Sequence, residues 1–116
     1  MVVKGYNTPW SVKAWAGKLE MLDKSKLANK SRSIYSCVLF SKEGQGSVSI
    51  LYLSPKAGVK KHRHTNDSEI YIFWDLKNQR LQYEICKKGN THELKNISEK
   101  RWAVVLSIKF ESESDK

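Results

Sequence analysis

The sequence predicts an all-β sandwich or barrel with a short helix near the N-terminus. From residue 33 onward, apolar and polar residues alternate with a period of two, which is typical of strands that bury one face. Glycine-bearing turns separate these segments at short and regular spacing, as in sandwiches and barrels. The 116 residues are 40% hydrophobic and include four Trp and five Tyr, so one domain of this length can bury a core.

Residues 1–32 are expected to form an arm and a short helix ahead of the barrel. Pro is tolerated at a first helical position, so a turn or short helix can begin at Pro9. Residues 10–22 have apolar residues at helical spacing interrupted by a glycine, and a strand over 18–22 fits nearly as well. The short helix is expected over residues 23–30, where Asp23 can cap the first turn.

Residues 33–111 are expected to form the barrel, and 112–116 a polar, frayed tail. The segments with strand character are 34–40, 48–53, 60–64, 69–74, 80–86, 91–96 and 102–110. The segment 69–74 is apolar on both faces, which predicts burial on both sides. On the segment 102–110 either face can line the interior.

The two faces of segment 69–74 carry different groups. Period two puts Glu69, Tyr71 and Phe73 on one face. Large apolar side chains share the other face: Ile70, Ile72 and Trp74. That face needs a cover, which is either the N-terminal segment with its Trp residues or a second copy of the chain, so a homodimer is one expectation.

All three histidines of the chain fall in two short stretches that can share one metal ion. His62 and His64 project to the same side of a strand, because residues two apart share a face. Glu69 opens the next strand and returns near the pair if the two strands are antiparallel, and His92 follows a glycine turn. Three imidazoles and one carboxylate suit Fe, Mn, Ni or Zn. One or two coordination positions would stay open for water or substrate, as catalytic sites require.

These two stretches resemble the two signature motifs of the cupin superfamily. One motif is H-x-H-x4-E, from His62 to Glu69, and the other is G-x2-H-x3-N, from Gly89 to Asn96. The resemblance implies a small jelly-roll-like β-barrel with a metal inside, held by a divalent-metal ligand set of His62, His64, Glu69 and His92. It also implies that Gly89 is a turn glycine and that Asn96 ties a backbone turn.

The path between the two motifs is shorter than the superfamily pattern, and position 56, where a glycine is expected, is Lys56. These departures predict a trimmed barrel that is more open on one side. The net charge of +9 is spread over the chain, with a cluster beside the histidines. Lys60 and Arg63 are therefore predicted to bind an anionic ligand at the rim, with Tyr71 and Phe73 in the pocket.

Three functions fit these observations, and the sequence leaves open whether the chain is an enzyme. The first is a metal-dependent oxygenase or isomerase acting on a small polar or anionic molecule. The second is a non-catalytic cupin that binds a phosphate- or carboxylate-bearing ligand, and the third is a structural dimerisation module. Hydrolase, P-loop, dinucleotide-binding and HExxH motifs are absent, as are recognised nucleic-acid-binding patterns.

The expected location is the cytoplasm. Cys37 and Cys86 lack CxxC partners and lie in apolar contexts, which indicates buried free thiols in a reducing compartment. The N-terminal residues lack the apolar region of a signal peptide, and no apolar stretch is long enough for a membrane span.

Overall fold

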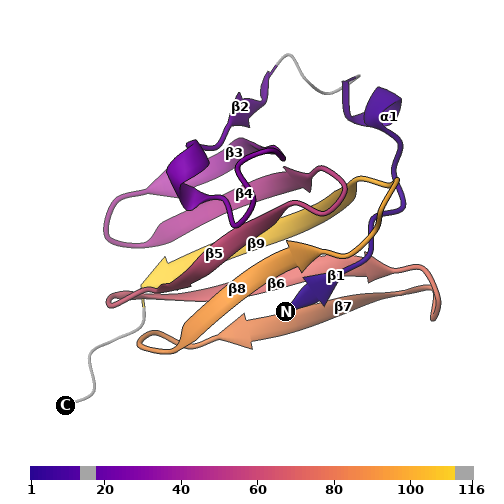
Figure 1. Cartoon of the computed structure of the whole chain (residues 1–116). Helices are drawn as coiled ribbons and strands as arrows, with labels where there is room; N and C mark the ends of the chain where they lie inside the picture. Colours follow the sequence, from indigo (N-terminus) through magenta and orange to yellow (C-terminus); the bar gives the residue numbers. More distant parts are fainter. Residues whose placement is uncertain (14–17, 112–116) are drawn as a thin grey trace.

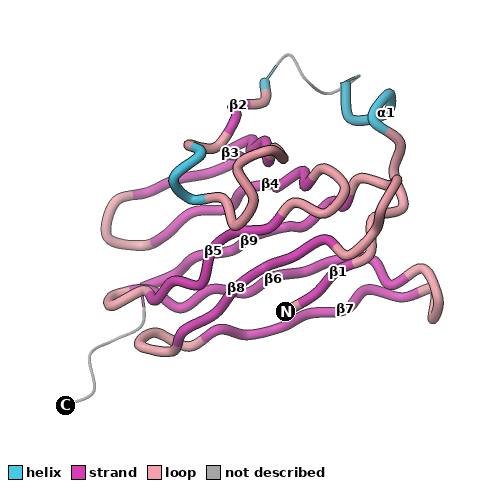
Figure 2. The backbone as a smooth tube through the Cα atoms, in the orientation of Figure 1, coloured by secondary structure: helices cyan, strands magenta, loops and turns pink. Residues whose placement is uncertain are grey.

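A computed structural model describes residues 1–13 and 18–111 of the chain (Figure 1). The strands are β1 (Val2–Val3), β2 (Glu20–Met21), β3 (Ile34–Lys42), β4 (Gly46–Leu53), β5 (Gly58–Arg63), β6 (Asp67–Asp75), β7 (Arg80–Cys86), β8 (Thr91–Asn96) and β9 (Ala103–Glu111). The two helical elements of the described residues are α1 (Pro9–Lys13) and the 3₁₀ turn η2 (Lys24–Lys26), both in the N-terminal part (Figure 2). The prediction of a mostly β chain with a short N-terminal helix is confirmed.

The strands form two sheets, one layered over the other (Figure 1). The large sheet has the order β2-β3-β4-β9-β6-β7, and the small sheet has the order β1-β8-β5. All pairings are antiparallel except that of β1 with β8. The predicted strand segments correspond to β3 through β9. The core between the sheets includes several side chains with 1% exposure or less: Leu27, Ile34, Leu53, Leu94 and Val105.

The N-terminal segment differs from the prediction in one respect. The prediction of a helix over residues 23–30 is wrong in its extent, because only the 3₁₀ turn η2 forms there. Asp23 does cap η2, since its side chain accepts a hydrogen bond from the Ser25 backbone N–H. Leu27 then adopts an extended backbone, bridges Val59 on β5 and is 1% exposed. Burying Leu27 against β5 outweighs the weak propensity of so short a helix.

A helix does begin at Pro9, as the sequence allowed. In the ambiguous segment, residues 14–17 lie outside the described residues, and residues 20 and 21 form β2. Strands before residue 33 pair with strands after it, β1 with β8 and β2 with β3. The bounds 1–32 and 33–111 stay a prediction, and residues 112–116 lie outside the described part of the chain.

The structure decides which face of β9 points inward. Ala103, Val105 and Ser107 are buried, whereas the alternate residues lie on the outer face. Part of the outer face is covered by α1, whose Val12 is 5% exposed and lies beside Tyr52. The end formed by β6 and β7 keeps large apolar side chains exposed: Leu81, Tyr83 and Ile85.

Asn96 ties the end of β8 to three other segments. Its side chain is fully buried, and its Oδ1 accepts hydrogen bonds from the backbone N–H groups of Gly5 and Ser98. Its Nδ2 donates to backbone oxygens of other segments: Leu53, Ser54 and Arg101. This network confirms the structural role that the cupin resemblance implied. The turn role of Gly89 is confirmed too, because its φ of 83° is one that L side chains rarely adopt.

Two further features bear on the sequence expectations. Cys37 and Cys86 are both free, Cys86 is buried and Cys37 is half-buried. No helix within residues 1–13 and 18–111 is long and apolar enough to cross a membrane.

Candidate metal centre

Four residues from both sheets converge at one point between the layers. β5 and β8 pair so that His62 lies directly across from His92, and His64 follows the end of β5. Glu69 reaches the same point from β6 in the large sheet. One ligand atom from each of the four lies within 4.8 Å of all the others. The predicted residues are therefore brought together, and they bridge the two sheets.

Three separations in this cluster match those between adjacent ligand atoms of one metal ion. The Nε2 atoms of His62 and His64 are 3.1 Å apart, and Glu69 Oε1 lies 3.1 Å from His92 Nε2 and 3.3 Å from His64 Nε2. Adjacent ligand atoms of an ion with bonds of about 2.1 Å lie about 3.0–3.4 Å apart. The Nδ1 of His62 lies 2.8 Å from the backbone oxygen of Lys60, which can orient the ring and leave Nε2 facing the cluster.

Glu69 is a buried carboxylate with an exposed fraction of only 2%. The Tyr71 hydroxyl donates to its Oε1 over 2.7 Å, and the Ser107 hydroxyl donates to its Oε2. Burial alone raises the pKa of Glu69, but the hydrogen bonds from Ser107 and Tyr71 and the charge of Lys109 outweigh burial and lower that pKa. Burial and the neighbouring carboxylate raise the pKa of Tyr71, so its hydroxyl keeps the proton that it donates. Glu69 is therefore held in the ionised form that a metal requires.

The surroundings of His64 favour its neutral form by lowering its pKa. Burial lowers its pKa, and Glu69 opposes this by raising it. The positive charge of Lys109 and the two neighbouring imidazoles lower it further. A neutral imidazole is the form that binds a metal ion, so the lowered pKa of His64 favours metal binding.

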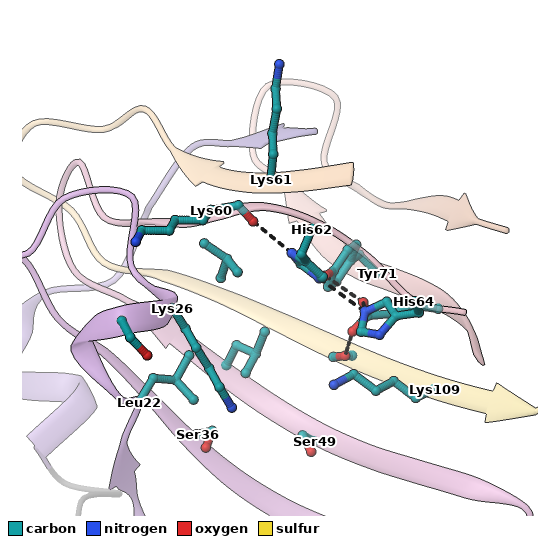
Figure 3. Close-up of a pocket in the computed structure, with 15 residues that line it drawn as sticks. Leu22, Lys26, Ser36, Ser49, Lys60, Lys61, His62, His64, Tyr71 and Lys109 are labelled. Carbon is teal, nitrogen blue, oxygen red and sulfur yellow. Dashed lines mark hydrogen bonds and ion pairs between the residues drawn. The ribbon is translucent and has the colours of Figure 1, made fainter. Parts of the chain in front are cut away.

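A cavity of about 460 Å³ opens beside the cluster and is lined by three of its residues, His62, His64 and Glu69. Figure 3 shows this cavity. Lys60 and Tyr71, both predicted to bind a ligand, line it. Phe73 lies beyond it, packs against the core and lines a different cavity with Trp74. Arg63 is exposed, and it ends β5 between the inward-facing His62 and His64, so period two directs it to the opposite face.

Several cavity residues were not predicted from the sequence. They are Lys26, Ser36, Ser49, Ser107 and Lys109. Ser107 and Lys109 lie on the inner face of β9. The sequence does not show which face of this strand is buried, so it could not predict that these two residues line the cavity. Lys26 comes from η2, and its place beside the cavity depends on the long-range bridge of Leu27 to β5.

The sequence matches no protein-family model and no curated protein. The structure is similar to a predicted oxalate decarboxylase from Thermotoga maritima, with 17% identity and a TM-score of 0.65 over 82% of this chain and 93% of that chain. It is also similar to an acetylacetone dioxygenase from Acinetobacter johnsonii, with 11% identity and a TM-score of 0.57 over 81% of this chain and 68% of that chain. A third similar structure is a cupin-2 domain from Rhodospirillum rubrum, with 16% identity and a TM-score of 0.53 over 100% of this chain and 80% of that chain. The cupin fold that the two motifs predicted is confirmed.

The hydrogen bonds to Glu69 give a testable prediction. Ser107→Ala and Tyr71→Phe each remove one donor to the carboxylate, and we expect each to weaken metal binding by about 10–100-fold. Competition with a chromophoric chelator measures the metal Kd, and circular dichroism checks the fold. Ser49→Ala, which removes a hydroxyl from the same cavity wall, is the matched control. Wild-type affinity in both donor variants would show that the donors do not orient the carboxylate.

Proposed function

We propose that this chain is a metal-binding cupin protein that holds one divalent ion, Fe, Mn, Ni or Zn, and binds a small polar or anionic molecule beside it. The four ligands in this proposal are His62, His64, Glu69 and His92. The observation that carries it is the convergence of four ligand atoms within 4.8 Å of one another, at the edge of an open cavity. Such a site leaves coordination positions that a small molecule can reach.

We place a metal-dependent oxygenase or isomerase first among the functions. When bound, the ion supplies a Lewis acid or an oxygen-binding centre. Two proteins of similar structure are a predicted oxalate decarboxylase and an acetylacetone dioxygenase, and the shared fold supports metal chemistry on small molecules only by analogy. The Tyr71 hydroxyl donates its proton to the Glu69 carboxylate in a hydrogen bond, so it is not available as a base. We therefore give the cavity residues of this chain the role of positioning the ligand.

The second function is non-catalytic binding of a carboxylate- or phosphate-bearing ligand. It is favoured by the titratable groups that line the cavity. Among the described residues that line the cavity, the titratable side chains other than the proposed metal ligands are those of Tyr71 and the lysines. Lysine ammonium groups attract anions but are poor bases while protonated.

Metal analysis of the purified chain tests the proposal. We expect about one equivalent of a divalent metal in the wild type and none in His62→Ala/His92→Ala, because the double variant loses two of the four ligands. Removing the metal with a chelator lowers the Tm of the wild type, since an ion at about 100-fold its Kd stabilises the folded state by about 2.7 kcal/mol.

Lys61→Ala is the control, because Lys61 shares β5 with His62 but points away from the other labelled residues (Figure 3). It keeps the metal and the chelator effect. A wild-type chain that takes up no stoichiometric metal contradicts the proposal. With metal bound, oxygen consumption in the presence of candidate substrates separates an oxygenase from a binding protein.

We also propose that the chain forms a homodimer through the outer face of β6 and β7. On β7, Leu81, Tyr83 and Ile85 are 53–70% exposed. They lie directly across from the outer residues of β6, namely Trp74, Ile72 and Ile70. The helix α1 covers the β4 and β9 part of this sheet but leaves the β7 end exposed. An apolar face of this kind, exposed on β7 and half-buried on β6, supports an interaction surface.

Sedimentation equilibrium tests the dimer. We expect a dimer for the wild type and a monomer for Tyr83→Lys, because a charge in the centre of the apolar face opposes its burial. Glu84→Gln is a control that changes the net charge by the same amount on the other face of β7, and it stays dimeric. A monomeric wild type at micromolar concentration contradicts the proposal.

A further inference from the structure

The central cavity has two ends, and only one of them is the candidate metal centre. β5 runs along the cavity, with His62 and the following His64 at its C-terminal end. Leu27 bridges Val59 near the start of the same strand, which places the neighbouring Lys26 beside that end. A bulge in β5 lies between Val59 and His62, and their partners on β8, Leu94 and His92, are two residues apart. At about 3.3 Å per strand residue, Val59 therefore stands roughly 7 Å from His62 along the strand.

Two lysines gather at the end away from the metal centre. A β-bulge between Val59 and His62 inserts an extra residue, and Lys60 extends toward the side of η2 while Lys61 points away (Figure 3). Lys26 descends from η2 toward Ser36 on β3 (Figure 3). Both lysines line the cavity and are exposed, so their charges are available to a ligand.

Apolar side chains line the cavity together with these charged groups. They are Leu22, Leu51 and Val59, and each is half-buried. In register, Leu51 on β4 pairs with Ser36 on β3, and two residues earlier Ser49 pairs with Ser107 at the metal centre. Leu51 therefore lies between the Ser36 end and the metal end on the floor of the cavity.

The charge along the cavity is strongly positive. Among the described residues that line the cavity, Glu69 is the one with an acidic side chain. Its carboxylate already accepts hydrogen bonds from Tyr71 and Ser107. Lys109 lies across from Glu69 in register, so it adds a positive charge at the metal end. A neutral ligand would add no charge pairing to the lysines that line the cavity.

We infer that the ligand of this cavity carries two anionic groups joined by a short apolar segment, as in a medium-length dicarboxylate. One group lies at the metal centre beside Lys109, the apolar segment packs on Leu51 and Val59, and the second group binds Lys26 and Lys60. This inference rests on the proposed metal-binding function and names the ligand class of the same site. Charge-assisted hydrogen bonds are stronger than neutral ones, so the two lysines favour a ligand with a second anionic group over one without it.

Calorimetry with adipate and hexanoate tests the inference. The two probes have the same carbon chain and differ in one terminal carboxylate. The protein is first loaded with one equivalent of Zn²⁺, which is redox-inert, and its metal content is measured. We expect adipate to bind with a Kd at least about tenfold lower than hexanoate, a difference of about 1.4 kcal/mol.

Charge-removing variants assign the second carboxylate. Lys26→Gln/Lys60→Gln erases the preference for adipate and leaves hexanoate binding unchanged, because the metal end is intact. Lys95→Gln, an exposed position on β8 outside the cavity lining, keeps the preference. If the metal-loaded wild type binds both probes equally, or if the preference survives in the double variant, the inference is overturned while the metal site stands. If the protein takes up neither Zn²⁺ nor Fe²⁺, Mn²⁺ or Ni²⁺, the proposed function fails as well.

Discussion

The site depends on one interaction, the burial of an ionised Glu69 carboxylate between the two sheets. A charge that is 2% exposed is costly unless it is paired, and removing its partners from such a group is strongly destabilising. Here Tyr71 and Ser107 donate to it from the large sheet, and His64 and His92 approach it from the side of the small sheet. The carboxylate thus connects the layers, and a cation at the same point would complete its neutralisation.

The framework supports this arrangement from both ends. His62 and His92 face each other because β5 and β8 are in register, and the backbone N–H of Gly89 donates to the His64 carbonyl over 2.7 Å, which joins the two motif segments directly. At the opposite end Asn96 holds three chain segments through its side-chain amide. The fold therefore fixes the histidines through the backbone, whereas the position of the carboxylate is set by side-chain hydrogen bonds.

The parts of the structure that could be predicted are those that depend on local pattern. Period two located strands β3 to β9, and the spacing of the histidines and Glu69 identified the four residues that converge. Non-local contacts account for what was missed. Leu27 is drawn out of a helix by β5, and Lys26 reaches the cavity for the same reason. Both faces of β9 are apolar enough to be buried, so only packing shows that Ser107 and Lys109 face inward. Arg63 and Phe73 lie beyond the cavity, the first because it alternates with the histidines and the second because it packs on the core.

The most direct test of the account is anomalous diffraction from crystals grown with one equivalent of metal. The account predicts a single anomalous peak between the sheets, with bonds of about 2.0–2.2 Å to the Nε2 atoms of His62, His64 and His92 and to the Glu69 carboxylate. An ion bound only at the protein surface, with the four side chains bonded to one another as a closed hydrogen-bond cluster, would contradict it.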